Sequence, residues 1–126
     1  MSSPRLDAEV EAPSTAGAVF RLLDVAFGFF VWAAHLLAVY IATAVACVLG
    51  LGAASAGTRA TFLTALALVT VAATAVVVLH AVRRYRRDRE VFDRRFPMGV
   101  TIGSDAIATV AIAWQFFPIL LVPVCA

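Results

Sequence analysis

The chain has 126 residues, of which 63% are hydrophobic and 14% charged, with a formal net charge of +2. Its mean hydropathy of +0.95 excludes an ordinary soluble domain, in which about half of the residues are apolar and periodically interrupted. The apolar residues fall instead in three runs, 27–50, 60–82 and 100–124. Each run is close to the ~20 residues that a helix needs to cross a bilayer. The sequence therefore predicts an all-α membrane protein with three transmembrane helices.

Residues 1–17 are expected to form a polar, mobile tail, because they contain prolines, serines and acids without an apolar period. They also lack the basic start and short apolar core of a signal peptide. Arg21 and Asp24 then lie one helical turn apart. This spacing predicts an interfacial helical turn that leads residues 18–126 into the membrane.

The first span is predicted at about residues 25–49, and it has two candidate packing faces. Small residues at every fourth position allow close helix approach in lipid: Ala34, Ala38, Ala42, Ala46 and Gly50. A second face turns His35 toward a neighbouring helix and is formed by Gly28, Val31, His35, Ala38 and Ala42. The alternative for the first face is that alanine is simply abundant in this chain, but five small residues in strict register favour a packed face.

The second and third spans are predicted at about 61–82 and 98–124, joined by an arginine-rich cytoplasmic loop at 83–97. This loop carries seven of the ten arginines, namely Arg83, Arg84, Arg86, Arg87, Arg89, Arg94 and Arg95. The positive-inside bias places such a loop in the cytoplasm, which puts the N-terminus inside and the C-terminus outside. The arginines are expected to contact anionic lipid head groups, and nucleic acid is not an expected partner.

Polar residues within spans are costly and are therefore candidate sites. His35 is expected to be a hydrogen-bonded structural histidine, with haem or metal ligation as the alternative. Asp105 either caps a helix or pairs with His35, which we estimate to lie at a similar depth. Gln115 lies further toward the outer side and is expected to hydrogen-bond across helices. His80 is placed at the shallow cytoplasmic end of the second span, a depth that excludes a haem site shared with His35.

Cys47 and Cys125 are both predicted at the outer ends of spans, because the arginines alone fix the orientation. That side of a bacterial plasma membrane is oxidising. A Cys47–Cys125 disulfide is therefore expected, and two free buried thiols are the alternative.

The chain has no nucleophile triad, phosphate loop or metal-ligand spacing, so we expect neither enzymatic activity nor a cofactor of its own. The segments 31–40, with Cys47 beyond, and 113–125 resemble the first and third spans of small three-helix bacterial membrane proteins. These proteins are encoded with the subunits of haem-copper cytochrome c oxidases. In the proteins that this chain resembles, an acidic residue stands at the position of Gln115, so the resemblance implies no proton-handling role for Gln115. It implies partners among integral membrane subunits, in a complex that carries haem and copper.

The leading functional expectation is therefore a non-catalytic accessory subunit or assembly partner of a respiratory complex in the bacterial inner membrane, with cytochrome c oxidase as the first candidate. One alternative is a small membrane protein that binds haem or quinone, or conducts protons or solutes. In that case, His35 and Asp105 would line the site. A second alternative is a self-associating membrane scaffold.

Overall fold

The computed structural model describes residues 14–121 and Cys125, so the predicted tail up to residue 13 and the predicted span residues 122–124 lie outside it. The described chain forms the helices α1 (Thr15–Val25), α2 (Phe27–Val48), η1 (Leu51–Ala53), α3 (Ala56–Asp88), η2 (Phe92–Arg94) and α4 (Arg95–Leu121). Three of the helices are long and apolar enough to cross a membrane. The predicted all-α architecture with three candidate spans is confirmed.

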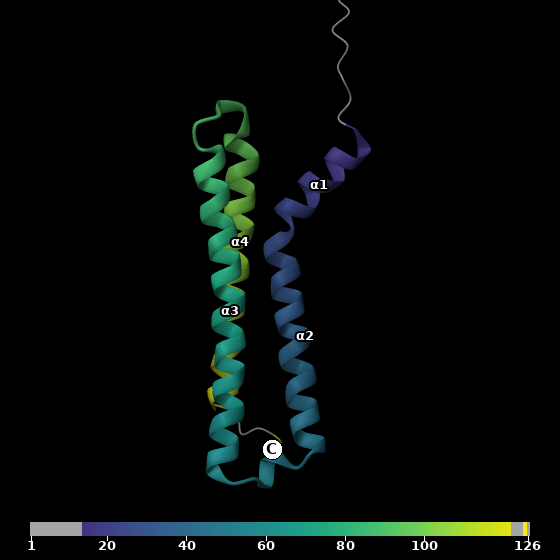
Figure 1. Cartoon of the computed structure of the whole chain (residues 1–126), viewed down its shortest axis with the longest axis vertical. Helices are drawn as coiled ribbons and strands as arrows, with labels where there is room; N and C mark the ends of the chain where they lie inside the picture. Colours follow the sequence, from purple (N-terminus) through teal and green to yellow (C-terminus); the bar gives the residue numbers. More distant parts are fainter. Residues whose placement is uncertain (1–13, 122–124, 126) are drawn as a thin grey trace, which may run out of the picture.

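The long helices run antiparallel to one another in sequence order. Helices α3 and α4 form a hairpin, and α2 packs against both of them. The α3–α4 connection lies at the same end as α1, and the α2–α3 connection lies at the opposite end (Figure 1). Ser14 caps helix α1, and its hydroxyl accepts a hydrogen bond from the backbone N–H of Gly17. The predicted tail at 1–17 is therefore wrong for residues 15–17, which form the first turn of α1. Helix α1 meets α2 at Ala26 and is tilted relative to it (Figure 1).

The expected arginine loop at 83–97 is wrong in its extent, because most of it is helical. Helix α3 continues to Asp88, and the connection is reduced to Arg89–Val91 before η2. Arginine has a high helix propensity, and Arg86 and Arg87 in the last turn interact favourably with the helix dipole. Residues 83–88 contain neither glycine nor proline, so α3 continues past the apolar run as far as Asp88. Pro97 lies in the first turn of α4, where proline is tolerated.

The first of the two predicted faces of α2 packs only in part within the chain. Ala46 is buried, whereas Ala34, Ala38 and Gly50 are exposed. A strict four-residue spacing advances 400° per step on an ideal helix, so the stripe winds around α2 instead of following one side. On the other predicted face, Gly28 and His35 are buried against the hairpin, whereas Ala38 is exposed.

Gly28 marks a close approach of α2 to α4. A Cβ atom at this position would lie 2.6 Å from Asp105 Oδ1 and 3.1 Å from the Cβ of Ala108. Close backbone approach at a glycine is a common way for helices to pack in lipid, where no hydrophobic effect drives association. The contact brings the backbone of α2 directly against the buried carboxyl group of Asp105.

The apolar core is small and lies between the three long helices. Val77, Ala108 and Ile112 are fully buried, with Trp32 and Ala73 packed against them. Most of the other large apolar side chains in the described spans are exposed, as expected of side chains that face lipid. Threonine hydroxyls along α3 and α4 donate to the carbonyl four residues earlier, for example from Thr70 to Leu66 at 2.9 Å. This arrangement satisfies a polar group inside the helix itself.

The predicted disulfide is present between Cys47 and Cys125, whose Cα atoms are 5.3 Å apart. This separation lies within the usual range for a disulfide. The bond joins residues 78 positions apart at the end of the bundle that holds the α2–α3 connection. It encloses α3 and α4 in a covalent loop.

Candidate functional site

Two layers of polar side chains cross the interior of the bundle. The first, which we name the carboxylate layer, consists of Asp24, His80 and Asp105. His80 Nδ1 lies 2.8 Å from Asp105 Oδ2, and its Nε2 lies 3.2 Å from Asp24 Oδ1. The side chain of Asp105 is 1% exposed, and the side chains of His80 and Asp24 are 22% and 28% exposed. The layer therefore extends from a buried carboxyl group toward the surface.

His80 is held between two carboxyl groups, and this fixes the hydrogen-bond chemistry of the layer. An imidazolium ring donates to both carboxylates. A neutral ring donates to one of them and accepts from the other, which must then carry a proton. The ring of Phe27 stacks on His80 at a centroid distance of 4.3 Å and limits its rotation. The layer can thus hold one proton in several arrangements without moving a helix.

The carboxylate layer continues into a network of ion pairs at the arginine end of α3. Arg84 Nη1 lies 2.6 Å from Asp24 Oδ2, and Arg84 Nε lies 2.8 Å from Asp88 Oδ2. Asp24 Oδ2, Arg84 Nε and Asp88 Oδ2 have no hydrogen-bond partner with suitable angles, so these contacts are ion pairs. Asp88 is fully buried and also meets Arg94 at 3.4 Å. A continuous series of polar and ionisable side chains thus links Asp105 with the surface at η2.

The second layer, which we name the amide layer, consists of His35, Thr70 and Gln115. His35 Nε2 lies 3.0 Å from Thr70 Oγ1, and its Nδ1 lies 3.1 Å from Gln115 Oε1. Because the Thr70 hydroxyl donates to the carbonyl of Leu66, it accepts from His35. Gln115 Oε1 can only accept, so in this arrangement both ring nitrogens of His35 must donate, which requires an imidazolium. If the Gln115 amide is turned by half a turn, a neutral ring completes the layer without a charge.

The two layers are separated by the same number of residues on α3 and on α4. Thr70 and His80 are ten residues apart on α3, and Asp105 and Gln115 are ten residues apart on α4. At 1.5 Å per residue the layers are about 15 Å apart. The apolar cluster of Val77, Ala108 and Ile112 fills the space between them.

The expected pairing of His35 with Asp105 is wrong, because the hydrogen-bond partner of Asp105 is His80. The alternative that Asp105 caps a helix is also wrong, since it lies within α4. The error arose from the shallow depth assigned to His80, which followed from ending the second span near residue 82. The sequence reasoning also missed Thr70, and it did not connect Asp24 with His80. The sequence did contain a signal for the two layers: polar residues are ten positions apart both before and after the 89–94 turn, at Thr70 and His80 and at Asp105 and Gln115.

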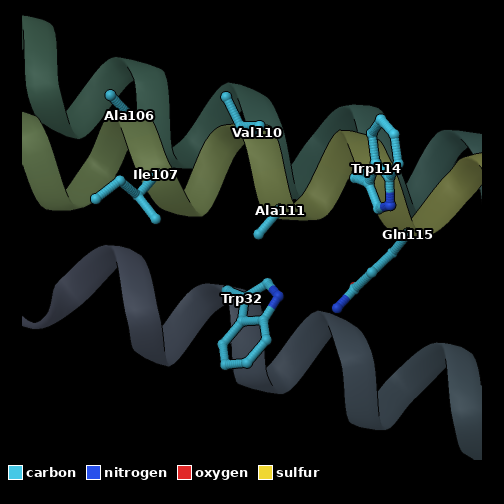
Figure 2. Close-up of a pocket in the computed structure, with 7 residues that line it drawn as sticks. All are labelled: Trp32, Ala106, Ile107, Val110, Ala111, Trp114 and Gln115. Atoms are coloured by element: carbon cyan, nitrogen blue, oxygen red, sulfur yellow. The ribbon is translucent and has the colours of Figure 1, made fainter.

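A groove lies on the surface of the bundle between α2 and α4. Its volume is about 560 Å³, and Figure 2 shows its lining residues, Trp32, Ala106, Ile107, Val110, Ala111, Trp114 and Gln115. Gln115 points from α4 toward α2, next to the ring of Trp32 (Figure 2). Trp114 and Ile107 are largely exposed along the groove. The surface is therefore mainly apolar and belongs to the part of the bundle that would face lipid or another helix.

Among residues 14–121 and Cys125, no three His, Cys, Asp or Glu side chains are grouped closely enough to hold a metal ion. The seven arginines predicted to contact head groups are divided between two environments. Arg84 is mostly covered by its ion pairs, whereas the other six are exposed at the end of the hairpin.

The fold and the two buried layers are those of a multi-pass helical membrane protein. Comparison with protein-family models, curated proteins and solved structures found no match.

Proposed function

We propose that this chain is a non-catalytic accessory subunit or assembly partner of a membrane respiratory complex, with a haem-copper cytochrome c oxidase as the first candidate. The resemblance of its first and third spans to small proteins encoded with such oxidases supports this choice of complex. The observation that carries the proposal is the outward face of α4. The bundle's own packing leaves this face open over several turns.

The outward face of α4 combines small residues with an adjoining groove. Nothing lies within 4 Å of a Cβ atom built at Gly99 or Gly103. These glycines continue along one side of the helix into Ile107, Val110 and Trp114, which line the groove. A partner helix can approach closely at the glycines and place larger side chains against the groove. The polar groups at Asp105, His35 and Gln115 meanwhile find partners inside the chain.

Co-purification in mild detergent tests the proposal. The tagged chain, isolated from its native membrane, should bring the respiratory complex with it. Replacing Gly103 with Leu should reduce recovery of the complex about tenfold or more, because loss of close packing at an interface centre costs about 2 kcal/mol. Ala75→Leu is the matched control, since Ala75 is exposed on α3, away from this face.

Two outcomes would contradict the proposal. One is wild-type chain that is recovered without other subunits. The other is a complex that the Gly103→Leu variant recovers as well as wild type. Self-association of the purified chain through α4 would instead support the scaffold alternative.

The proposed orientation places α1 and the hairpin connection in the cytoplasm and the disulfide outside. A reporter inserted at Gly52 should therefore behave as external, and one inserted at Asp88 as cytoplasmic. Seven arginines near the hairpin connection give the physical reason, because basic residues next to spans are retained inside. The reverse labelling pattern would invert the topology and remove the reason for a disulfide on that side.

The carboxylate layer favours a second candidate function, which is proton handling within the membrane. His80 joins buried Asp105 to Asp24, beside a hollow of about 210 Å³ that Arg83 and Arg87 also line. This role ranks second because Val77 and Ile112 separate the carboxylate layer from the amide layer. The purified chain alone, in vesicles loaded with a pH-sensitive dye, would move protons only under this second candidate.

A further inference from the structure

Three arginines from different parts of the chain line a second hollow, which adjoins the carboxylate layer through the contact of Arg84 with Asp24. It has a volume of about 210 Å³ and is lined by Arg21 of α1, Arg84 of α3 and Arg94 of η2, together with Val25 and Pro97. Arg21 is not one of the clustered arginines of the hairpin. Only the folded bundle brings it to the other two.

One of the three guanidinium groups, that of Arg84, is held in place by two carboxylates, and that of Arg94 contacts one of the same carboxylates from a more exposed position. Arg84 contacts Asp24 and Asp88, and its side chain is only 15% exposed. Arg94 contacts the same Asp88, which is fully buried. Formally, the two carboxylates balance the two positive charges of Arg84 and Arg94, so the net positive charge of the lining comes from Arg21. Arg21, which is exposed on α1, adds a third positive charge to the lining.

The position of the hollow relative to the apolar segments defines the kind of ligand. Val25 is two residues before the start of α2, and Pro97 lies in the first turn of α4. Both residues lie next to the start of an apolar run. In a helix that crosses a bilayer, this position is the interface, where lipid head groups lie. The neighbouring side chains Phe20 and Leu22 of α1 are 71% and 68% exposed. The acyl chains of a lipid bound here could contact these apolar side chains, whereas a free phosphate ion would make no apolar contact.

We propose that this hollow binds the phosphate group of one anionic phospholipid. Guanidinium groups bind phosphate through charge-assisted, often bidentate, hydrogen bonds. Three of them around one small hollow define a single saturable site. That site differs from the general attraction between a basic segment and an anionic membrane, and it does not depend on the respiratory complex.

Native mass spectrometry of the purified chain in detergent tests the site. With phosphatidylglycerol added, the wild-type protein should retain one lipid molecule, and with phosphatidylcholine it should retain much less. The Arg21→Gln variant should bind phosphatidylglycerol at least about tenfold more weakly, because it loses a charge-assisted hydrogen bond to the phosphate, and tenfold corresponds to about 1.4 kcal/mol. Arg86→Gln is the matched control. It removes the same charge from an exposed position on α3 that does not line the hollow.

Four results decide the question. Loss in Arg21→Gln and retention in Arg86→Gln support the site. Equal loss in both variants would overturn it in favour of diffuse attraction, and retention in both would overturn it outright. Inorganic phosphate in large molar excess separates the two sources of a phosphate group. If it displaces the lipid completely, the ligand is free phosphate and the lipid assignment fails. An unchanged melting temperature and an intact disulfide would show that the variants are folded.

Discussion

Replacing Asp105 with Ala is expected to destabilise the bundle by about 3–5 kcal/mol, because it breaks a buried pair and leaves one member behind. Asp105 is 1% exposed, and its Oδ2 lies 2.8 Å from His80 Nδ1. Without it, His80 keeps only Asp24 as a hydrogen-bond partner. The free energy of unfolding, measured by titration with a denaturing detergent, provides the test.

A double-mutant cycle identifies the partner of Asp105. Combining Asp105→Ala with His80→Ala should give an interaction energy of about 0.5–3 kcal/mol. Combining it with His35→Ala should give additive losses to within about 0.5 kcal/mol, because His35 contacts Thr70 and Gln115 instead. Coupling of Asp105 to His35 and not to His80 would refute the arrangement of the two layers.

A methyl group at Gly28 should also be strongly destabilising. In the Gly28→Ala variant the new Cβ would lie 2.6 Å from Asp105 Oδ1 and 3.1 Å from the Cα of the same residue. The second of these atoms is backbone and cannot rotate away, so α2 and α4 must separate. Overpacking of this kind costs about 1–3 kcal/mol, and it also disturbs the contact of Asp105 with His80. Unfolding of the purified variant in the same detergent series measures the loss.

Gly103→Ala is the matched control, because it makes the same change on α4. Nothing lies within 4 Å of its Cβ position, and alanine favours a helix over glycine by about 0.8–1.0 kcal/mol. The control should therefore be neutral or slightly stabilising, opposite in sign to Gly28→Ala. Equal losses at the two positions would mean that the close approach of α2 to α4 at Gly28 does not exist.

The three spans could be predicted from the sequence because their signal is local. Long apolar runs identify a helix in lipid whatever it packs against. The disulfide could be predicted because the arginines place the outer ends of the first and third spans together. Gly28 and His35 were also predicted to share an inward face, and both are buried.

The partners within the bundle could not be predicted, because they depend on where the connections turn. Extending α3 from residue 82 to Asp88 moves His80 from the membrane edge to the level of Asp105. Hydropathy does not report this extension, since arginines continue a helix without being apolar. The small-residue stripe failed for a related reason. Composition identifies which residues permit close contact but not which side of α2 faces the hairpin.

The bond between Cys47 and Cys125 makes the greater part of this protein a ring in the topological sense. Every peptide bond from residue 47 to residue 125 has a second covalent route around it. A protease that cuts the exposed connection at Arg89–Glu90 therefore opens the ring without releasing a fragment. Both halves of the hairpin remain attached at the far end of the bundle. Only the combination of a cut and a reductant would let α4 leave, so the connection at the arginine end can be nicked or lengthened while the molecule stays in one piece.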